Sequence, residues 1–286
     1  MLRREAERSV ASIEVLSQVD SQELFTRAAK IASTKEQHFW SPVVLSGECR
    51  AAPPCRHCKW ESFKSARPAF GLAKSEAEVL RCAEAALHAG ATHLLAPSGW
   101  LGPKIPEYFC ERIRALKKHF NAEIYGLCGA VDKSSLERLR DAGMDGYQCG
   151  LESPDETVYR RFRPGGDSLT DRIRTLRDAK SLGLKTWSGF LLAFGLSDAA
   201  ALEGLKTLKK LDTDWIAVQP FVPYPNTELQ TEDPTNPYRW TRMMAIARLY
   251  FDPRVHIVAS ENSGVYANFV DKTGANAFFI FPNQNL

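Results

Sequence analysis

The sequence predicts a single α/β domain of the (β/α)8, TIM-type barrel class, preceded by short N-terminal helices. Three observations support this prediction. Short apolar segments alternate with helix-like segments about every 30 residues, the pattern of repeated parallel βαβ units. Eight such apolar segments can be counted. The length of 286 residues also suits one α/β barrel. We expect an N-terminal helical extension over residues 1–35 and the barrel over residues 36–286.

The N-terminal extension has apolar residues at helical spacing and therefore predicts two helices. The first contains Val10, Ile13 and Leu16, and the second contains Leu24, Ala28 and Ile31. Asp20 or Ser21 can cap the second helix, because short polar side chains accept hydrogen bonds from the first free N–H groups of a helix.

The barrel elements follow in alternation. The predicted strands cover residues 42–45, 92–96, 122–127, 146–151, 185–193, 215–221, 255–259 and 275–281. The predicted helices between them cover residues 75–89, 106–120, 134–142, 169–182, 199–211, 238–250 and 265–270. In such barrels the functional groups lie on the loops after the carboxyl ends of the strands. The segments that follow the strands are therefore the candidates for a site.

Composition excludes several classes of function. Hydrophobic residues make up 44% and charged residues 25%, which is ordinary for a globular chain. No apolar run approaches the roughly 18 residues of a membrane span. The net charge of +3 is spread along the chain rather than gathered, so no nucleic-acid partner is expected. The seven cysteines are an odd number and no secretory signal is apparent, so we expect a reducing, cytoplasmic location.

Three cysteines lie close together in the loop after the first predicted strand. Cys49, Cys55 and Cys58 have the spacing C-x5-C-x2-C, and two prolines stiffen the loop between them. Thiolates select zinc, copper(I) or iron–sulfur clusters. Three thiolates would leave one iron of a [4Fe–4S] cluster open for another ligand. The remaining cysteines are isolated and are expected to be packed thiols: Cys82, Cys110, Cys128 and Cys149.

This loop resembles that of the radical S-adenosylmethionine (SAM) superfamily, whose cluster binds SAM at the open iron. Over residues 20–282 the chain is similar to the biotin synthase-like branch of that superfamily. The usual spacing there is C-x3-C-x2-C, and the two additional residues resemble the HmdB (HcgA) proteins. Those proteins are associated with maturation of the iron-guanylylpyridinol cofactor of [Fe]-hydrogenase. The resemblance implies a [4Fe–4S] cluster held by Cys49, Cys55 and Cys58, with SAM as second cofactor.

The resemblance also implies a set of SAM-binding residues. By position, His57 and Phe221 would lie near the adenine, and Ser98 and Gly99 would contact the amino group. Glu152 would bind the ribose hydroxyls or the amino-acid end. Arg172 would bind the carboxylate, because an arginine in the first turn of a helix adds its charge to the positive helix end. Without the barrel context, a solvated helix face made of Arg172, Arg174 and Arg177 would be the preferred interpretation.

The substrate region is implied by the same resemblance. Biotin synthase has a second cluster on cysteines inside its barrel, and the matching positions here hold Pro97 (or Ala96), Tyr125 and Trp187. A second cluster is therefore not expected. Tyr125, Gln148, Trp187 and Gln219 are instead expected to line a pocket for a small organic substrate.

The implied function is that of a radical SAM enzyme. It would cleave SAM reductively to a 5′-deoxyadenosyl radical that abstracts hydrogen from the substrate. The loop spacing favours a role in making the pyridinol portion of the [Fe]-hydrogenase cofactor. The implied partners are the substrate and an electron donor of the ferredoxin or flavodoxin type. Methylornithine synthase-like or tyrosine lyase-like activity, a non-enzymatic zinc-binding barrel, and a SAM-binding scaffold without turnover remain as alternatives.

Overall fold

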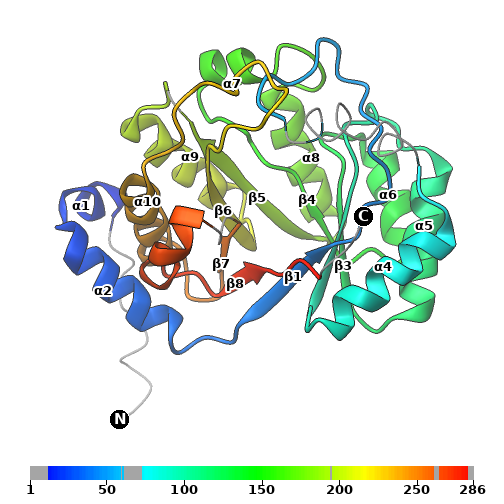
Figure 1. Ribbon diagram of the computed structural model, residues 1–286, viewed down its shortest axis with the longest axis horizontal. Coiled ribbons are helices and arrows are strands. Elements are labelled where there is room, and N and C mark those ends of the chain that lie inside the picture. The colour runs from blue at the N-terminus through cyan, green and yellow to red at the C-terminus, as the bar shows by residue number, and fades with distance from the viewer. Residues whose placement is uncertain (1–11, 59, 61–72, 194, 261–263, 283–286) are drawn as a thin grey trace.

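The computed structural model describes residues 12–58, 60, 73–193, 195–260 and 264–282, and it contains a closed barrel of eight parallel strands. The strands pair in sequence order, and the first also pairs with the last, His38 opposite Ala277, which closes the sheet. Figure 1 shows the strands at the centre and the helices around them. The predicted fold class is confirmed.

The strands agree with the predicted ones in number and order. They are β1 His38–Pro42, β2 His93–Pro97, β3 Glu123–Leu127, β4 Gly146–Gln148, β5 Lys185–Leu192, β6 Trp215–Pro220, β7 His256–Ala259 and β8 Ala277–Phe279. The first was placed wrongly, at residues 42–45. Ser41 is polar but fully buried, so the strand does not look apolar in the sequence. Val43 and Leu45 lie beyond its end, although their backbone N–H groups still donate to β2 carbonyl oxygens.

The helices also follow the predicted order. They are α1 Ile13–Gln18, α2 Ser21–Ala32, α4 Glu76–His88, α5 Glu107–His119, α6 Lys133–Asp141, α7 Glu156–Phe162, α8 Leu169–Ser181, α9 Asp198–Lys210 and α10 Pro237–Tyr250. The predicted helix at residues 265–270 is a 3-10 helix, η2 Gly264–Lys272. Helix α7 was not predicted, because its seven residues are too few to show a clear period. The Asp155 side chain caps it by accepting from Val158 N.

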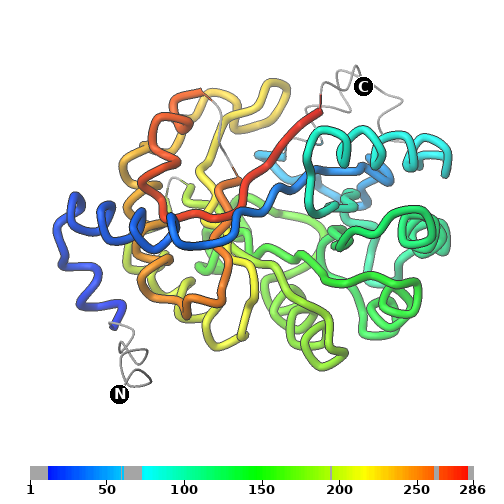
Figure 2. Tube along the Cα trace, turned by 90° about the horizontal axis from the view of Figure 1, so that it is seen from below, coloured from blue at the N-terminus to red at the C-terminus, as the bar shows by residue number. Residues whose placement is uncertain are grey.

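The N-terminal helices pack against α10, as Figures 1 and 2 both show. Arg242 on α10 donates hydrogen bonds to the carbonyl oxygens of Ser17 and Val19 and to the Ser21 hydroxyl. The predicted helical position Val10 lies outside the described residues. Within the part of the chain that the structure describes, no helix is long and apolar enough to cross a membrane.

Aromatic side chains fill the interior of the barrel on the amino-terminal side. Trp40, Tyr125, Trp187 and Trp215 are each no more than 2% exposed and belong to one cluster. The Trp215 indole N–H donates to the Tyr125 hydroxyl at 3.0 Å. This packing closes one end of the barrel, so that access is from the carboxyl ends of the strands.

Three histidines near the amino-terminal ends of the strands predict a pH-dependent stability. The ring centroids of His38 and His256 are 4.5 Å apart, and those of His38 and His93 are 5.1 Å apart. Burial lowers the pKa of His93 and of His256 from 6.5 to about 4 and also lowers the pKa of His38. Glu123 Oε2 lies 3.7 Å from His93 Nε2 and favours the charged imidazole, but burial outweighs it and the pKa of His93 stays lowered.

The unfolded chain therefore takes up protons between pH 6.5 and 4 that the folded chain does not. Stability should be level above pH 6.5 and fall on acidification, by at most roughly 1.4 kcal/mol per pH unit for each histidine. Urea unfolding at pH 7.5 and 5.5 measures this fall. A His93→Gln, His256→Asn double variant should lose most of it, and an unchanged pH dependence in that variant would contradict the assignment.

Candidate functional site

A cavity of about 460 Å³ opens at the carboxyl ends of the strands. Its volume is within the range of small-molecule sites. All eight strands, or the segments that follow them, contribute to its lining. This is the end of the barrel where the sequence placed the candidate residues.

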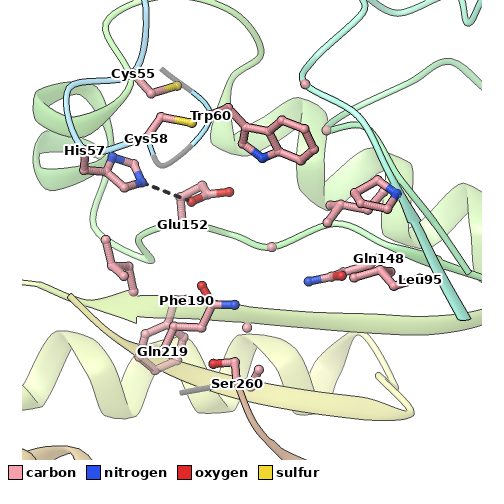
Figure 3. Close-up of a pocket in the computed structure, with 18 of the residues that line it drawn as sticks. Cys55, His57, Cys58, Trp60, Leu95, Gln148, Glu152, Phe190, Gln219 and Ser260 are labelled. Atoms are coloured by element: carbon pink, nitrogen blue, oxygen red, sulfur yellow. Dashed lines mark ion pairs between the residues drawn. The ribbon is translucent and has the colours of Figure 1, made fainter. Parts of the chain in front are cut away.

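The three predicted cysteine ligands come together on one wall of the cavity. Cys49, Cys55 and Cys58 all line it, and none forms a disulfide. Figure 3 shows Cys55 and Cys58 at the same end of the cavity as His57. We call residues 49–58 the cysteine loop.

Backbone hydrogen bonds fix the cysteine loop to three other parts of the barrel. Arg50 N donates to the Trp100 carbonyl oxygen after β2, at 2.7 Å. Arg56 N donates to the Phe162 carbonyl oxygen at the end of α7, and Leu229 N after β6 donates to the Arg56 carbonyl oxygen. The loop is therefore held in place by its neighbours.

The cysteine loop presents three free thiols to the cavity. Among the described residues, no group of three or more His, Cys, Asp or Glu side chains converges closely enough to hold one metal ion. The three thiols nevertheless face one cavity, as ligands of a larger iron–sulfur cluster would. Burial raises the pKa of the Cys55 thiol to about 12, so iron binding must displace a proton there.

Ser98 and Gly99 lie directly beside Cys49. Both line the cavity, and the Ser98 hydroxyl donates to the Gly99 carbonyl oxygen at 2.8 Å. A Cβ atom at Gly99 would lie 2.4 Å from the Glu48 carbonyl oxygen and 2.5 Å from the Cys49 Cβ. Any side chain at this position would therefore displace the first cysteine.

A buried charged network adjoins the cysteines; it consists of Glu152, Arg163, Asp167 and Arg172. Asp167 lies between the two arginines, with its Oδ1 2.5 Å from Arg163 Nη2 and its Oδ2 3.1 Å from Arg172 Nε. Burial alone would raise the pKa of Asp167, but Arg172 and Arg163 hold it at about 2. All four groups are therefore charged at neutral pH, and the two carboxylates compensate the two guanidinium groups.

Arg172 is a buried member of the network and not part of a solvated face. Its side chain is 3% exposed, and its Nη1 donates to Glu152 Oε1 at 2.7 Å and to the Gly150 carbonyl oxygen. Ser168 caps the start of α8 with Asp171 in a capping box, which places Arg172 near the end of the first turn. Arg174 and Arg177 on the same helix are exposed.

Glu152 connects the network to His57. It is one of the described non-glycine residues in the left-handed region, with φ 60°, a conformation that is uncommon and concentrates at functional sites. Burial favours its neutral form, but Arg172 and Arg163 outweigh this and keep the pKa of Glu152 below its usual value. His57 Nε2 lies 3.8 Å from Glu152 Oε2, and burial lowers the pKa of His57 to about 4. The imidazole is therefore neutral.

Of the four residues expected to line a substrate pocket, three line the cavity and one does not. Gln148, Trp187 and Gln219 line the cavity, as does Phe221 from the group expected near adenine. Tyr125 was placed wrongly: it is absent from the lining, and its ring is fully buried in the aromatic layer below. It faces the barrel interior as expected, but one layer deeper.

Cys128 and Cys149 are packed thiols. Both are fully buried, neither lines the cavity, and burial raises the pKa of each to about 12. The Cys128 sulfur lies 3.0 Å from the Tyr147 hydroxyl oxygen.

Sequence reasoning gave no role to Arg163, Asp167 or Trp100, although all three adjoin the site. Arg163 lines the cavity and donates to the Cys55 sulfur at 3.1 Å. Trp100 also lines it and donates to the Ala130 carbonyl oxygen. The available signal was an acidic residue, Asp167, placed four and five positions from two arginines, a spacing that also occurs on many exposed surfaces.

Residues 45–208, more than half of the chain, match the family model of the radical SAM superfamily. The chain belongs to this superfamily. Radical SAM proteins use a [4Fe–4S] cluster and SAM, and these are the cofactors of this chain.

The radical SAM chain is similar to curated proteins of the biotin synthase type. It is 26% identical to biotin synthase of Saccharopolyspora erythraea over 243 residues, 80% of this chain and 66% of the relative. It is 29% identical to biotin synthase of Alkalilimnicola ehrlichii over 72% of this chain and 63% of the relative. An uncharacterized protein of Methanocaldococcus jannaschii is 24% identical over 84% of this chain and 64% of the relative. The chain thus spans slightly less than two thirds of these relatives.

Solved structures show the same fold. Methylornithine synthase superposes with a TM-score of 0.81 and 21% identity, over 96% of this chain and 83% of the other. HydG, a maturase of [FeFe]-hydrogenase, superposes with a TM-score of 0.79 and 16% identity, over 93% and 63%. At these identities the likeness concerns the barrel fold alone.

Proposed function

We propose that this chain is an enzyme in which Cys49, Cys55 and Cys58 ligate the [4Fe–4S] cluster and the cavity holds SAM together with a small organic substrate. The observation that carries the proposal is that the three cysteines and the charged network open on the same cavity. When bound, the cluster and SAM supply a 5′-deoxyadenosyl radical that abstracts a hydrogen atom from the substrate. The chain itself positions the partners and excludes water.

The charged network suits the amino-acid end of SAM, which carries one positive and one negative group. Arg172 is the partner for the carboxylate, and Glu152 accepts from the ammonium group or the ribose hydroxyls. Asp167 and Arg163 keep Arg172 and Glu152 in place. Asp167 pairs with both arginines, and Arg163 also donates to the Cys55 sulfur. Ser98 and Gly99 flank the amino group. The neutral His57 and Phe221 offer ring surfaces for the adenine.

For the reaction itself, we propose a step in assembly of the pyridinol portion of the [Fe]-hydrogenase cofactor, with electrons from a ferredoxin or flavodoxin type of donor. Support for this comes from the C-x5-C-x2-C spacing. A second candidate is another biotin synthase-like radical SAM reaction, such as a methylornithine synthase-like one, which is compatible with the similarity to biotin synthases.

Anaerobic reconstitution with iron and sulfide tests the enzyme class. The protein is expected to bind about four irons, and the EPR signal after reduction should change when SAM is added, since SAM ligates the open iron. Iron content near eight that persists after Cys128→Ala and Cys149→Ala would reveal a second cluster. Stoichiometric zinc without iron uptake would refute the proposal in favour of a structural zinc site.

A further inference from the structure

The charged side chains of the described cavity lining are concentrated at one end. They are Glu152, Arg163 and Arg172, and all belong to the charged network. Each is already compensated by a partner: Arg172 by Glu152 at 2.7 Å, and Arg163 by Asp167 at 2.5 Å. When SAM takes its carboxylate and ammonium partners from this network, as proposed above, no further charged side chain of the described lining is left for a second ligand.

The cavity lining also contains neutral hydrogen-bonding groups. Gln148 at the end of β4 is 8% exposed, and its Oε1 has no hydrogen-bond partner among the described residues. The Ser260 hydroxyl, after β7, also lacks one. Figure 3 shows the amide groups of Gln148 and Gln219 directed towards the same space. A buried polar atom without a partner costs about 1–3 kcal/mol, so a ligand that supplies the missing bond is favoured.

Aromatic rings form the wall next to these amides. The ring centroids of Trp187 and Phe279 are 5.8 Å apart, and those of Phe279 and Phe281 are 5.9 Å apart with planes only 12° from parallel. All three residues line the cavity. Trp187 is fully buried, whereas Phe281 is 62% exposed, so the aromatic wall extends from the cavity floor to its rim. Such surfaces favour a flat ring.

We propose that the substrate is a neutral, planar heterocycle with an N–H and a C=O group side by side, bound by Gln148 and Gln219 and stacked on the aromatic wall. A primary amide has one acceptor oxygen and two donor N–H groups, which complement an adjacent N–H and C=O pair. A substrate carboxylate or ammonium group would instead lose hydration without gaining a counter-charge. The inference rests on the proposed function, because it assigns the substrate to the cavity that holds SAM.

Three small probes test this inference on the reconstituted full chain with saturating SAM. 2-Pyridone is neutral and planar, pyridine-2-carboxylate is planar but anionic, and L-tyrosine is zwitterionic. Binding is measured by saturation-transfer NMR titration. 2-Pyridone is expected to bind at least about tenfold more tightly than either charged probe. A tenfold difference in affinity corresponds to the cost of leaving one buried hydrogen-bonding group or charge without a partner. Equal or tighter binding of L-tyrosine or pyridine-2-carboxylate would overturn the inference.

A pair of variants locates the contact. Gln148→Leu keeps the approximate size but removes the amide, and it should weaken 2-pyridone binding at least about fivefold. Gln22→Leu, at an exposed position on α2, is the matched control and should leave binding unchanged. Equal losses in both variants would refute the assignment of Gln148. If Gln148→Leu does not fold, the ranking of the probes on the unaltered chain still decides the inference.

Reductive cleavage of SAM by the unaltered chain is measured in the same samples. Its absence would count against the proposed function, whereas cleavage together with the wrong ranking of probes would count against the substrate class alone.

Discussion

Replacing Arg172 with alanine is expected to lower the free energy of unfolding by about 3–5 kcal/mol, the cost of leaving a buried charge without its partner. The guanidinium is 3% exposed and serves two carboxylates, Asp167 and Glu152. Without it, Asp167 keeps its ion pair with Arg163 and the hydrogen bond from Ala130 N but loses one of its two arginines, and Glu152 loses its ion pair with Arg172. SAM binding should also weaken, by roughly ten- to a hundredfold, because a charge-assisted bond to the carboxylate is lost. Urea unfolding of the metal-free protein and calorimetric titration with SAM measure the two effects.

Arg174→Ala is the matched control for this prediction. It lies on the same helix, 54% exposed, and its pair with Asp171 should contribute less than about 1 kcal/mol. Arg172→Lys should recover only part of both losses, because a point charge cannot bond two carboxylates as a planar fork does. An Arg172→Ala protein with the stability and SAM affinity of the unaltered chain would show that the network is not essential and that the carboxylate is bound elsewhere.

Replacing Cys55 with alanine is expected to reduce bound iron from about four per chain to less than one and to abolish reductive cleavage of SAM, since only two thiolates would remain. Cys55 is 6% exposed on the cavity wall and accepts a hydrogen bond from Arg163, so its sulfur has no substitute in the loop. Iron analysis after anaerobic reconstitution, together with the absorbance of the cluster, measures the loss.

Cys82→Ala controls for the general effect of removing a thiol. Cys82 lies on α4 and is not part of the cavity lining, so iron content and SAM cleavage should be unchanged. Full iron content in the Cys55 variant would require a different set of ligands.

The barrel could be predicted from the sequence because its strands recur at a regular interval and most are strongly apolar. The exception is instructive: β1 contains Ser41, which is fully buried, and His38, so its composition resembles that of a loop. Ser41 is buried because β1 lies between β2 and β8. The residues of β1 alone do not reveal these neighbours. Helix α7 was missed for a different reason, because its seven residues are too few to show a helical period.

Site residues could be predicted where a short sequence motif marks them. They could not be predicted where their place depends on how deep a side chain lies in the barrel or on contacts between distant parts of the chain. The cysteine spacing identifies its loop directly. Tyr125 and Gln148 both face the barrel interior, but only Gln148 lies at the end of its strand, and the sequence does not give the depth of either. The contact between Arg163 and Cys55 joins residues 108 positions apart. Only the folded chain brings them together.

Pairing of β1 with β8 has a consequence for the order of folding. The strand that precedes the cysteine loop keeps one unpaired edge until residues 277–279 have been synthesised, because His38 to Trp40 pair with them. Contacts this distant in sequence form slowly, and an open strand edge invites association with other chains in the meantime. Iron delivered during synthesis would therefore meet an unfinished cavity. We therefore expect cluster insertion to follow closure of the barrel, with the open intermediate prone to association until then.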